Sequence, residues 1–252
     1  MYKDIATALD SHEIRYYIVY GSAIGTIREK GFVPWDDDMD LAVMEEDIPL
    51  VDKILKDDLD SEKYYYCPKG ADYHPHVILK SEDMISKLRD RTAPFIDIFI
   101  IAPYPSKRRR VFPYKIAMWC ELLSSNVIDR IGSVTIVRLF SWMVPFFGKI
   151  RNMISNSDTE YTTIVDYYFK KCIFKKSDYG KPVLKTFEDT TVPLPKEYDM
   201  MLKKIYGDYM SPPPEDERRG STGFPCSALQ EYIIKHPESK LEPCIFNKHH
   251  KR

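Results

Sequence analysis

A cluster of acidic residues directly precedes an apolar segment in PWDDDMDLAVM, residues 34–44. Four carboxylates occupy five consecutive positions: Asp36, Asp37, Asp38 and Asp40. Charged and apolar side chains alternate over residues 38–44, and this pattern predicts a β-strand. Because side chains two positions apart on a strand share a face, we expect Asp38 and Asp40 on one face and their apolar neighbours toward the core. The fold must therefore place concentrated negative charge at the margin of a sheet.

Two like charges so close together destabilise each other unless a positive charge lies between them. A divalent cation meets this need, and hard oxygen ligands suit Mg²⁺ or Mn²⁺. FIDIFII, residues 95–101, predicts a central strand in which Asp97 is the single charge, and an isolated buried carboxylate is costly. If the two strands are neighbours, Asp38, Asp40 and Asp97 converge on one metal site. The alternatives are a solvated turn for the acidic run and a cap or arginine pair for Asp97.

A glycine and a serine lie between a predicted strand at residues 15–20 and a predicted helix at 23–30. Gly21 and Ser22 would then present free backbone N–H groups and a hydroxyl at a helix N-terminus, which favours anion binding. This signal is weak by itself. Followed by two strand aspartates and a later single one, it is the pattern of the nucleotidyltransferase fold, in which a phosphate cradle faces a metal.

The periodicity of the rest of the chain predicts an α/β (α+β) fold with a mixed sheet. Further strands are expected at residues 64–67 and 76–79, and further helices at 2–12, 47–59, 111–125, 127–155, 160–170 and 197–206. Prolines and turn residues exclude regular structure from 207–220. We expect a nucleotidyltransferase-like catalytic core over residues 1–105 and a mainly helical region over 106–252 that completes the substrate sites.

Composition limits the partners and the compartment. The formal net charge is -1, so no overall field recruits nucleic acid, and the basic run at residues 107–110 is typical of solvated surface. The five cysteines are scattered without a CxxC pair, which disfavours a disulfide framework and a zinc site. The N-terminus lacks an apolar core after a basic start, so no signal peptide is predicted. A cytoplasmic, reducing location is expected.

One apolar segment, residues 131–148, bears on that location. IGSVTIVRLFSWMVPFFG is interrupted by Arg138 and Pro145, and a membrane-spanning helix needs about 20 predominantly apolar residues. We therefore expect a buried helix. The alternative is an element in the membrane interface, with Trp142 and the two phenylalanines inserted, which would place the protein peripherally at the inner face of a membrane.

These residues resemble the signature of the LicD family, which includes phosphocholine transferases and is related to fukutin-related protein. Residues 20–44, YGSAIGTIREKGFVPWDDDMDLAVM, fill every position of the family patterns G-[TS]-x-x-G-x-x-R and G-F-[IV]-P-W-D-D-D-x-D. IYGDYMSPPPEDER at 205–218 is similar to the family's C-terminal YGDYM-x-x-PP segment. FIDIFIIAPYP at 95–105 resembles its I-D-I-F strand, although Ala102-Pro103 stands where the family usually has a further aspartate.

The resemblance implies metal-dependent transfer of a phospho-substituted alcohol, phosphocholine or similar, from a CDP-linked donor. The acceptor would be a hydroxyl of a cell-surface glycan or its lipid-linked precursor. Asp38, Asp40 and Asp97 would be the catalytic residues that hold Mg²⁺ or Mn²⁺, with Asp97 as third ligand or as base for the attacking hydroxyl. Gly21 and Ser22 would contact the donor phosphates.

Other residues of the two blocks would also bind substrate. Arg28 would neutralise developing phosphate charge, and its alternative is a salt bridge to Asp36 or Asp37. The residues of the second block that would close over the donor are Tyr206, Asp208 and Arg218. His74 and His76 suggest a metal pair, but Pro75 separates them and no third ligand is near in the sequence. We expect them in a loop, where one is available to line the acceptor site.

Two other functions remain open. A nucleotidyltransferase on the same fold would add a nucleoside monophosphate to a small molecule or a protein. A glycan- or partner-binding module with a degenerate site would need no catalysis, although three intact carboxylates argue against it.

Overall fold

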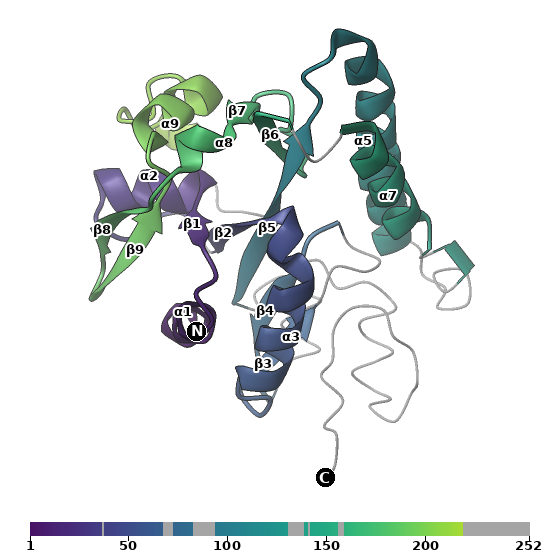
Figure 1. Cartoon of the computed structure of the whole chain (residues 1–252). Helices are drawn as coiled ribbons and strands as arrows, with labels where there is room; N and C mark the ends of the chain where they lie inside the picture. Colours follow the sequence, from purple (N-terminus) through teal and green to yellow (C-terminus); the bar gives the residue numbers. More distant parts are fainter. Residues whose placement is uncertain are drawn as a thin grey trace.

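A mixed sheet lies at the centre of the protein (Figure 1). The computed structural model describes residues 1–36, 38–67, 73–82, 94–130, 139–140, 142–155 and 159–218. The strands of the sheet are β1 (Tyr16–Ile18), β2 (Met39–Met44), β3 (Tyr64–Cys67), β4 (His76–Leu79), β5 (Phe95–Tyr104), β6 (Tyr161–Ile164) and β7 (Phe174–Lys175). Their main order is β1-β2-β5-β4-β3, with β6 paired to β5 and β7 to β6. β2 and β5 run parallel and the other neighbours antiparallel, which confirms the predicted α/β (α+β) class.

Helices surround this sheet. They are α1 (Tyr2–Ser11), α2 (Tyr20–Arg28), α3 (Ile48–Asp58), α5 (Arg108–Arg130), α7 (Met143–Ser155), α8 (Lys176–Tyr179) and α9 (Tyr198–Tyr206), with short 3-10 helices η1 (Glu45–Asp47) and η2 (Glu215–Glu217). A separate hairpin comprises β8 (Val183–Phe187) and β9 (Thr190–Leu194). In Figure 1, α5 and α7 pack together at one edge of the molecule, whereas α2, α9 and the β8–β9 hairpin lie at the other.

The two faces of the sheet differ because successive strand residues alternate between them. On β2, Met39 and Leu41 pack in the large core cluster that also contains side chains of α1 and α3. Ala42 packs in a second cluster, with Phe99 of β5 and with side chains of α9. Asp40 has the same parity as Ala42. Its carboxylate therefore projects on the second face, as the alternating pattern predicted.

The helical hairpin of α5 and α7 replaces two predicted helices. The expected helix at 111–125 lies within α5, but the expected helix at 127–155 is interrupted at Trp142, a turn residue directly before α7. Residues 131–138 and 141, much of the apolar segment, lie outside the described residues. Among the residues that are described, no helix combines the length and apolar character needed to cross a membrane.

The helix predicted at residues 160–170 is wrong. Residues 161–164 form β6 and continue the sheet beyond residue 105, pairing with the last four residues of β5. Thr162, Thr163 and Ile164 are β-branched, and such side chains favour strands. The Thr162 and Thr163 hydroxyls donate to the carbonyls of Phe174 and Phe169, at 3.3 and 2.6 Å, so their burial leaves no unpaired donor. The strands β7, β8 and β9 were also not predicted.

Candidate active site

Carboxylates from two parallel strands meet on the second face of the sheet. Asp40 of β2 and Asp97 of β5 are direct Cα partners, and Asp38 immediately precedes β2. One side-chain oxygen of each of Asp38, Asp40 and Asp97 lies within 4.8 Å of the others. The structure thus brings together the three residues that the sequence pattern placed at one site.

The electrostatics of this site are unfavourable without a cation. Asp40 is only 8% exposed. Burial, followed by the charges of Asp38, Asp97 and Asp36, raises the pKa of Asp40 well above its usual range. A hydrogen bond from the Ser22 backbone N–H opposes that shift. Three carboxylate oxygens at this spacing are the donor set that hard divalent cations such as Mg²⁺ prefer, so the residues present fit such an ion.

The start of α2 lies against these carboxylates. The helix begins at Tyr20, not at Ala23 as predicted, and Tyr20 has a left-handed φ of 49°. A Cβ built on Gly21 would lie 2.5 Å from Asp36 Oδ2, so only glycine fits without displacing that carboxylate. The Ser22 hydroxyl accepts a hydrogen bond of 2.9 Å from the Asp40 N–H, and Ser22 is 2% exposed. Ser22 therefore ties α2 to β2 through its side chain.

A second glycine explains the spacing of the G-[TS]-x-x-G pattern. A Cβ on Gly25 would lie 2.4 Å from the Gly31 carbonyl oxygen and 3.0 Å from the Val33 nitrogen. Both are backbone atoms, which cannot move aside as a side-chain tip can. Gly25 therefore allows α2 to pack directly on the turn that leads into the acidic run.

Two arginines from distant parts of the chain converge on Trp35. The guanidinium carbons of Arg28 and Arg218 lie 5.6 and 5.2 Å from the centre of the Trp35 ring, within cation–π range. Arg28 also pairs with Glu29 at 2.7 Å and donates to the Tyr209 carbonyl at 3.2 Å. Trp35 thus joins the two sequence blocks next to the acidic run. Asp37, one alternative partner of Arg28, lies outside the described residues.

The other two residues of the second block lie in different surroundings. Tyr206 is 45% exposed, yet its pKa lies well above its usual range because of desolvation and the nearby charge of Asp40. The charge of Asp40 thus acts on Tyr206. Asp208 is exposed and accepts a hydrogen bond of 2.6 Å from Ser211, which lowers the pKa of Asp208. This contact stabilises a surface turn.

The sequence matches a known family over the part of the chain that builds this site. Residues 13–121 match the family described as LicD/FKTN/FKRP, nucleotidyltransferase domain, and they include α2, β2 and β5. Residues 13–121 form a LicD-family domain. It is similar to the lipopolysaccharide cholinephosphotransferase LicD of Haemophilus influenzae, with 25% identity over 234 residues, covering 83% of this chain and 87% of that protein.

Two shorter matches involve uncharacterised proteins of Rickettsia. One, from Rickettsia prowazekii, is 38% identical over 53 residues, or 21% of this chain and 20% of that protein. Another, from Rickettsia typhi, is 40% identical over 45 residues, or 18% of this chain and 15% of that protein.

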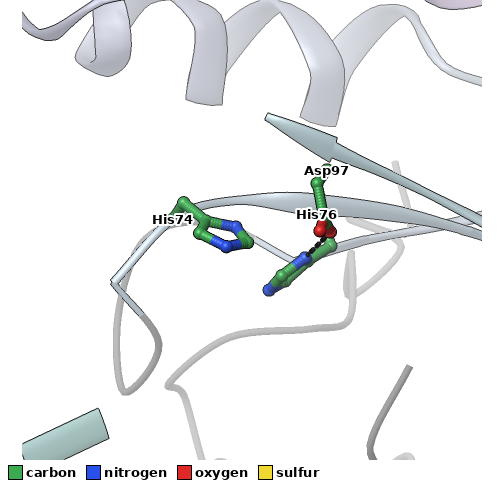
Figure 2. A group of neighbouring side chains, drawn as sticks. All are labelled: His74, His76 and Asp97. Atoms are coloured by element: carbon green, nitrogen blue, oxygen red, sulfur yellow. Dashed lines mark hydrogen bonds and ion pairs between the residues drawn. The ribbon is translucent and has the colours of Figure 1, made fainter. Parts of the chain in front are cut away.

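The sequence suggested His74 and His76 as a metal pair but did not reveal that they lie beside the carboxylates. His76 is the first residue of β4, the strand predicted at residues 76–79, and the Cα partner of Asp97, so its interpretation as a loop residue without a third ligand is wrong. Figure 2 shows His76 bonded to Asp97, with 2.6 Å between Nδ1 and Oδ1. The ring centre of His74 lies 4.5 Å from that of His76. The H-x-H spacing in the sequence indicated a metal pair. The third ligand, Asp97, becomes evident only from the pairing of β4 with β5.

A buried aspartate beyond β6 was missed as well. Asp166 is 7% exposed, it accepts a hydrogen bond from the Tyr167 N–H, and burial raises its pKa. A hydrogen bond with the Tyr20 hydroxyl and the nearby charge of His74 favour the ionised form. Asp166 therefore contacts the start of α2 and lies within electrostatic range of His74. The wrong helix prediction for residues 160–170 concealed it.

Proposed function

We propose that this protein transfers a phospho-substituted alcohol, phosphocholine or similar, from a CDP-linked donor to a hydroxyl of a cell-surface glycan or its lipid-linked precursor. The convergence of Asp38, Asp40 and Asp97 opposite the start of α2 is the observation that carries this proposal. The similarity to a lipopolysaccharide cholinephosphotransferase supports choline phosphate as the transferred group.

Asp38, Asp40 and Asp97 would hold Mg²⁺ or Mn²⁺. When bound, such an ion supplies positive charge for the donor's diphosphate, and positioning with charge stabilisation accounts for most catalysis of phosphoryl transfer. The contacts of Asp40 and Asp97 hold these two residues in place before substrate arrives. The Ser22 backbone and hydroxyl hold Asp40, and His76 holds Asp97.

The donor's phosphates would lie between this site and the arginines at Trp35. Backbone N–H groups at the start of α2 favour an anion there, and Gly21 leaves room for the Asp36 carboxylate beside them. Arg28 and Arg218 supply fixed positive charge, because guanidinium groups stay protonated and pair with phosphate oxygens in a bidentate manner. Tyr206 would contact the donor from the opposite block. Asp208 would act through the turn that it stabilises.

The reaction exchanges one phosphorus–oxygen bond for another. The oxygen of the acceptor hydroxyl attacks the phosphorus that carries the alcohol, and the bond from that phosphorus to the CMP oxygen breaks. CMP leaves with the bonding pair. The hydroxyl proton passes to a carboxylate of the site, for which Asp97 is the candidate that the resemblance implies.

Exposed apolar side chains on the helical hairpin support an acceptor at a membrane surface. Phe112, Ile116 and Leu123 on α5 are 73%, 49% and 51% exposed, and their spacing places them on one side of that helix. Trp142 and Phe146 are 56% and 46% exposed and have the same spacing of four. The basic run at residues 107–110 begins α5, which suits anionic headgroups. The helical hairpin of α5 and α7 would thus hold the protein at the cytoplasmic face of a membrane.

The donor assay separates this function from nucleotidyl transfer, which the family's domain description favours as the second candidate. Purified protein is incubated with Mg²⁺, an acceptor glycan and CDP-choline, CDP-ribitol or CDP-glycerol. Release of CMP with transfer of the alcohol phosphate supports the proposal. Incorporation of the nucleotide supports the second candidate, and no consumption of any nucleotide by folded protein supports a binding module.

A further inference from the structure

Asp97 lies between two groups of metal-ligating side chains. On one side are Asp38 and Asp40, and on the other are His74 and His76. Asp97 is the Cα partner of Asp40 on β2 and of His76 on β4, so the three side chains form a row across three neighbouring strands. Because directly paired residues point to the same face of a sheet, this row is a consequence of strand register.

The two imidazoles are buried and held in place by packing. His74 and His76 are each 4% exposed. Phe99 packs on His74 with 4.5 Å between ring centres, and the rings of His74 and His76 meet edge to face (Figure 2). The hydrogen bond from His76 to Asp97 fixes the second ring. The three side chains therefore cost little further ordering when a ligand binds among them.

We propose that His74, His76 and Asp97 form a second divalent-cation site, which shares Asp97 with the carboxylate site. One donor atom from each of the three residues lies within 4.8 Å of the others. Two imidazole nitrogens and one carboxylate oxygen suit Zn²⁺, Co²⁺ or Mn²⁺ better than Mg²⁺, which prefers oxygen. Asp97 has two oxygens, so one carboxylate can serve both sites, as in centres whose two cations are about 3.5–4 Å apart.

A cation ligated by Nδ1 of His76 would replace the hydrogen bond between His76 and Asp97. A nitrogen that ligates a metal must be free of its proton, so the His76 ring would carry its proton on the other nitrogen. The site rests on the positions of three side chains and does not depend on the proposed transferase function. It also differs from the carboxylate site in the class of cation that it prefers.

The test is a Co²⁺ titration of the full chain in excess Mg²⁺, followed by visible absorption and by elemental analysis of the protein after desalting. Mg²⁺ occupies the carboxylate site, and the absorption of Co²⁺ reports nitrogen ligation. We expect one bound Co²⁺ with a nitrogen-ligated spectrum. In His74→Ala and His76→Ala, the affinity should fall by at least about tenfold, as loss of even an outer-sphere partner does.

Matched variants make the result specific. His12→Ala removes an exposed histidine that pairs with Asp58, and it should bind Co²⁺ as the unchanged protein does. Asp38→Asn should keep the Co²⁺ site. The proposal is overturned if folded His74→Ala and His76→Ala, checked by circular dichroism, retain the same Co²⁺ affinity and spectrum, or if the unchanged protein binds no Co²⁺ in Mg²⁺. The outcome of the Co²⁺ titration does not depend on the donor assay. If the donor assay fails, the proposal of the histidine site is unaffected.

Discussion

Asp40 and Asp97 are direct partners across β2 and β5, the parallel strand pair of the described sheet. Because the register pairs these two residues, their carboxylates project side by side on the face opposite the large core cluster. A shift of one residue in either strand would send one carboxylate into that core. The candidate site therefore depends on the same pairing that builds the centre of the fold.

The first prediction concerns the charge at this pair. Asp40→Asn should lower turnover by roughly 10²–10³-fold, since it removes one fixed charge from the site. The melting temperature without metal should stay unchanged or rise, because the substitution relieves repulsion that raises the pKa of Asp40. Turnover with a CDP-linked donor and thermal unfolding by circular dichroism measure the two effects. Full turnover in the folded variant would exclude Asp40 from catalysis.

The second prediction concerns the aromatic support of the two arginines. Trp35→Ala should raise the KM for the donor by about tenfold, because each cation–π contact is worth about 0.5–2 kcal/mol and both Arg28 and Arg218 lose it. Trp35→Phe keeps an aromatic face and should have a smaller effect. Steady-state kinetics with varied donor concentration give the comparison. Equal KM values for the unchanged protein, Trp35→Ala and Trp35→Phe would show that Trp35 does not contribute to donor binding.

The third prediction concerns the apolar surface of the helical hairpin. Substitution of Trp142 and Phe146 by serine should reduce sedimentation with vesicles of anionic lipid, since both side chains are about half-exposed. Leu184→Ser, which changes a 66% exposed leucine on β8, is the matched control and should sediment like the unchanged protein. If the double variant also sediments unchanged, the hairpin is not the membrane contact.

The fourth prediction concerns the buried ion cluster that anchors the hairpin. Arg151 is completely buried, and it donates to Glu121 at 2.7 Å and to Glu45 at 2.7 Å, joining α7 to α5 and η1. Arg151→Met should lower the free energy of unfolding by about 3–5 kcal/mol, because it leaves buried carboxylates without their cation. Urea unfolding measures this.

A surface ion pair provides the control for Arg151. Lys203→Met breaks the exposed pair with Asp199 and should leave the free energy of unfolding nearly unchanged, because solvent screens the pair. If the two substitutions have similar effects, the cluster at Arg151 is not a significant source of stability.

Local sequence patterns were sufficient to predict the two strands that carry Asp40 and Asp97. Alternation over residues 38–44 predicted β2, and an apolar run around one charge predicted β5. The cost of isolated charge then indicated that Asp97 and Asp40 belong together, and the strand pairing agrees. These inferences succeeded because each depends on neighbouring residues or on a strong physical penalty.

The remaining features depend on contacts between distant segments. His76 lies beside Asp97 because β4 pairs with β5, and no local sequence pattern reveals that pairing. Asp166 follows β6, whose β-branched residues were overlooked in favour of helical spacing. Arg28 bonds the carbonyl of Tyr209, 181 positions away. Strand order and long-range side-chain contacts thus limited what the sequence predicted about this site.

The most direct test of the account is Mn²⁺ binding, measured by electron paramagnetic resonance, with Mg²⁺ as competitor. We expect that the unchanged protein binds Mn²⁺ that Mg²⁺ displaces, and that Asp97→Asn loses this binding because β5 no longer contributes its charge. Asp189→Asn, which changes an exposed carboxylate paired with Lys3, should bind as before. A folded Asp97→Asn protein that binds Mg²⁺-displaceable Mn²⁺ as tightly as the unchanged protein would contradict the account.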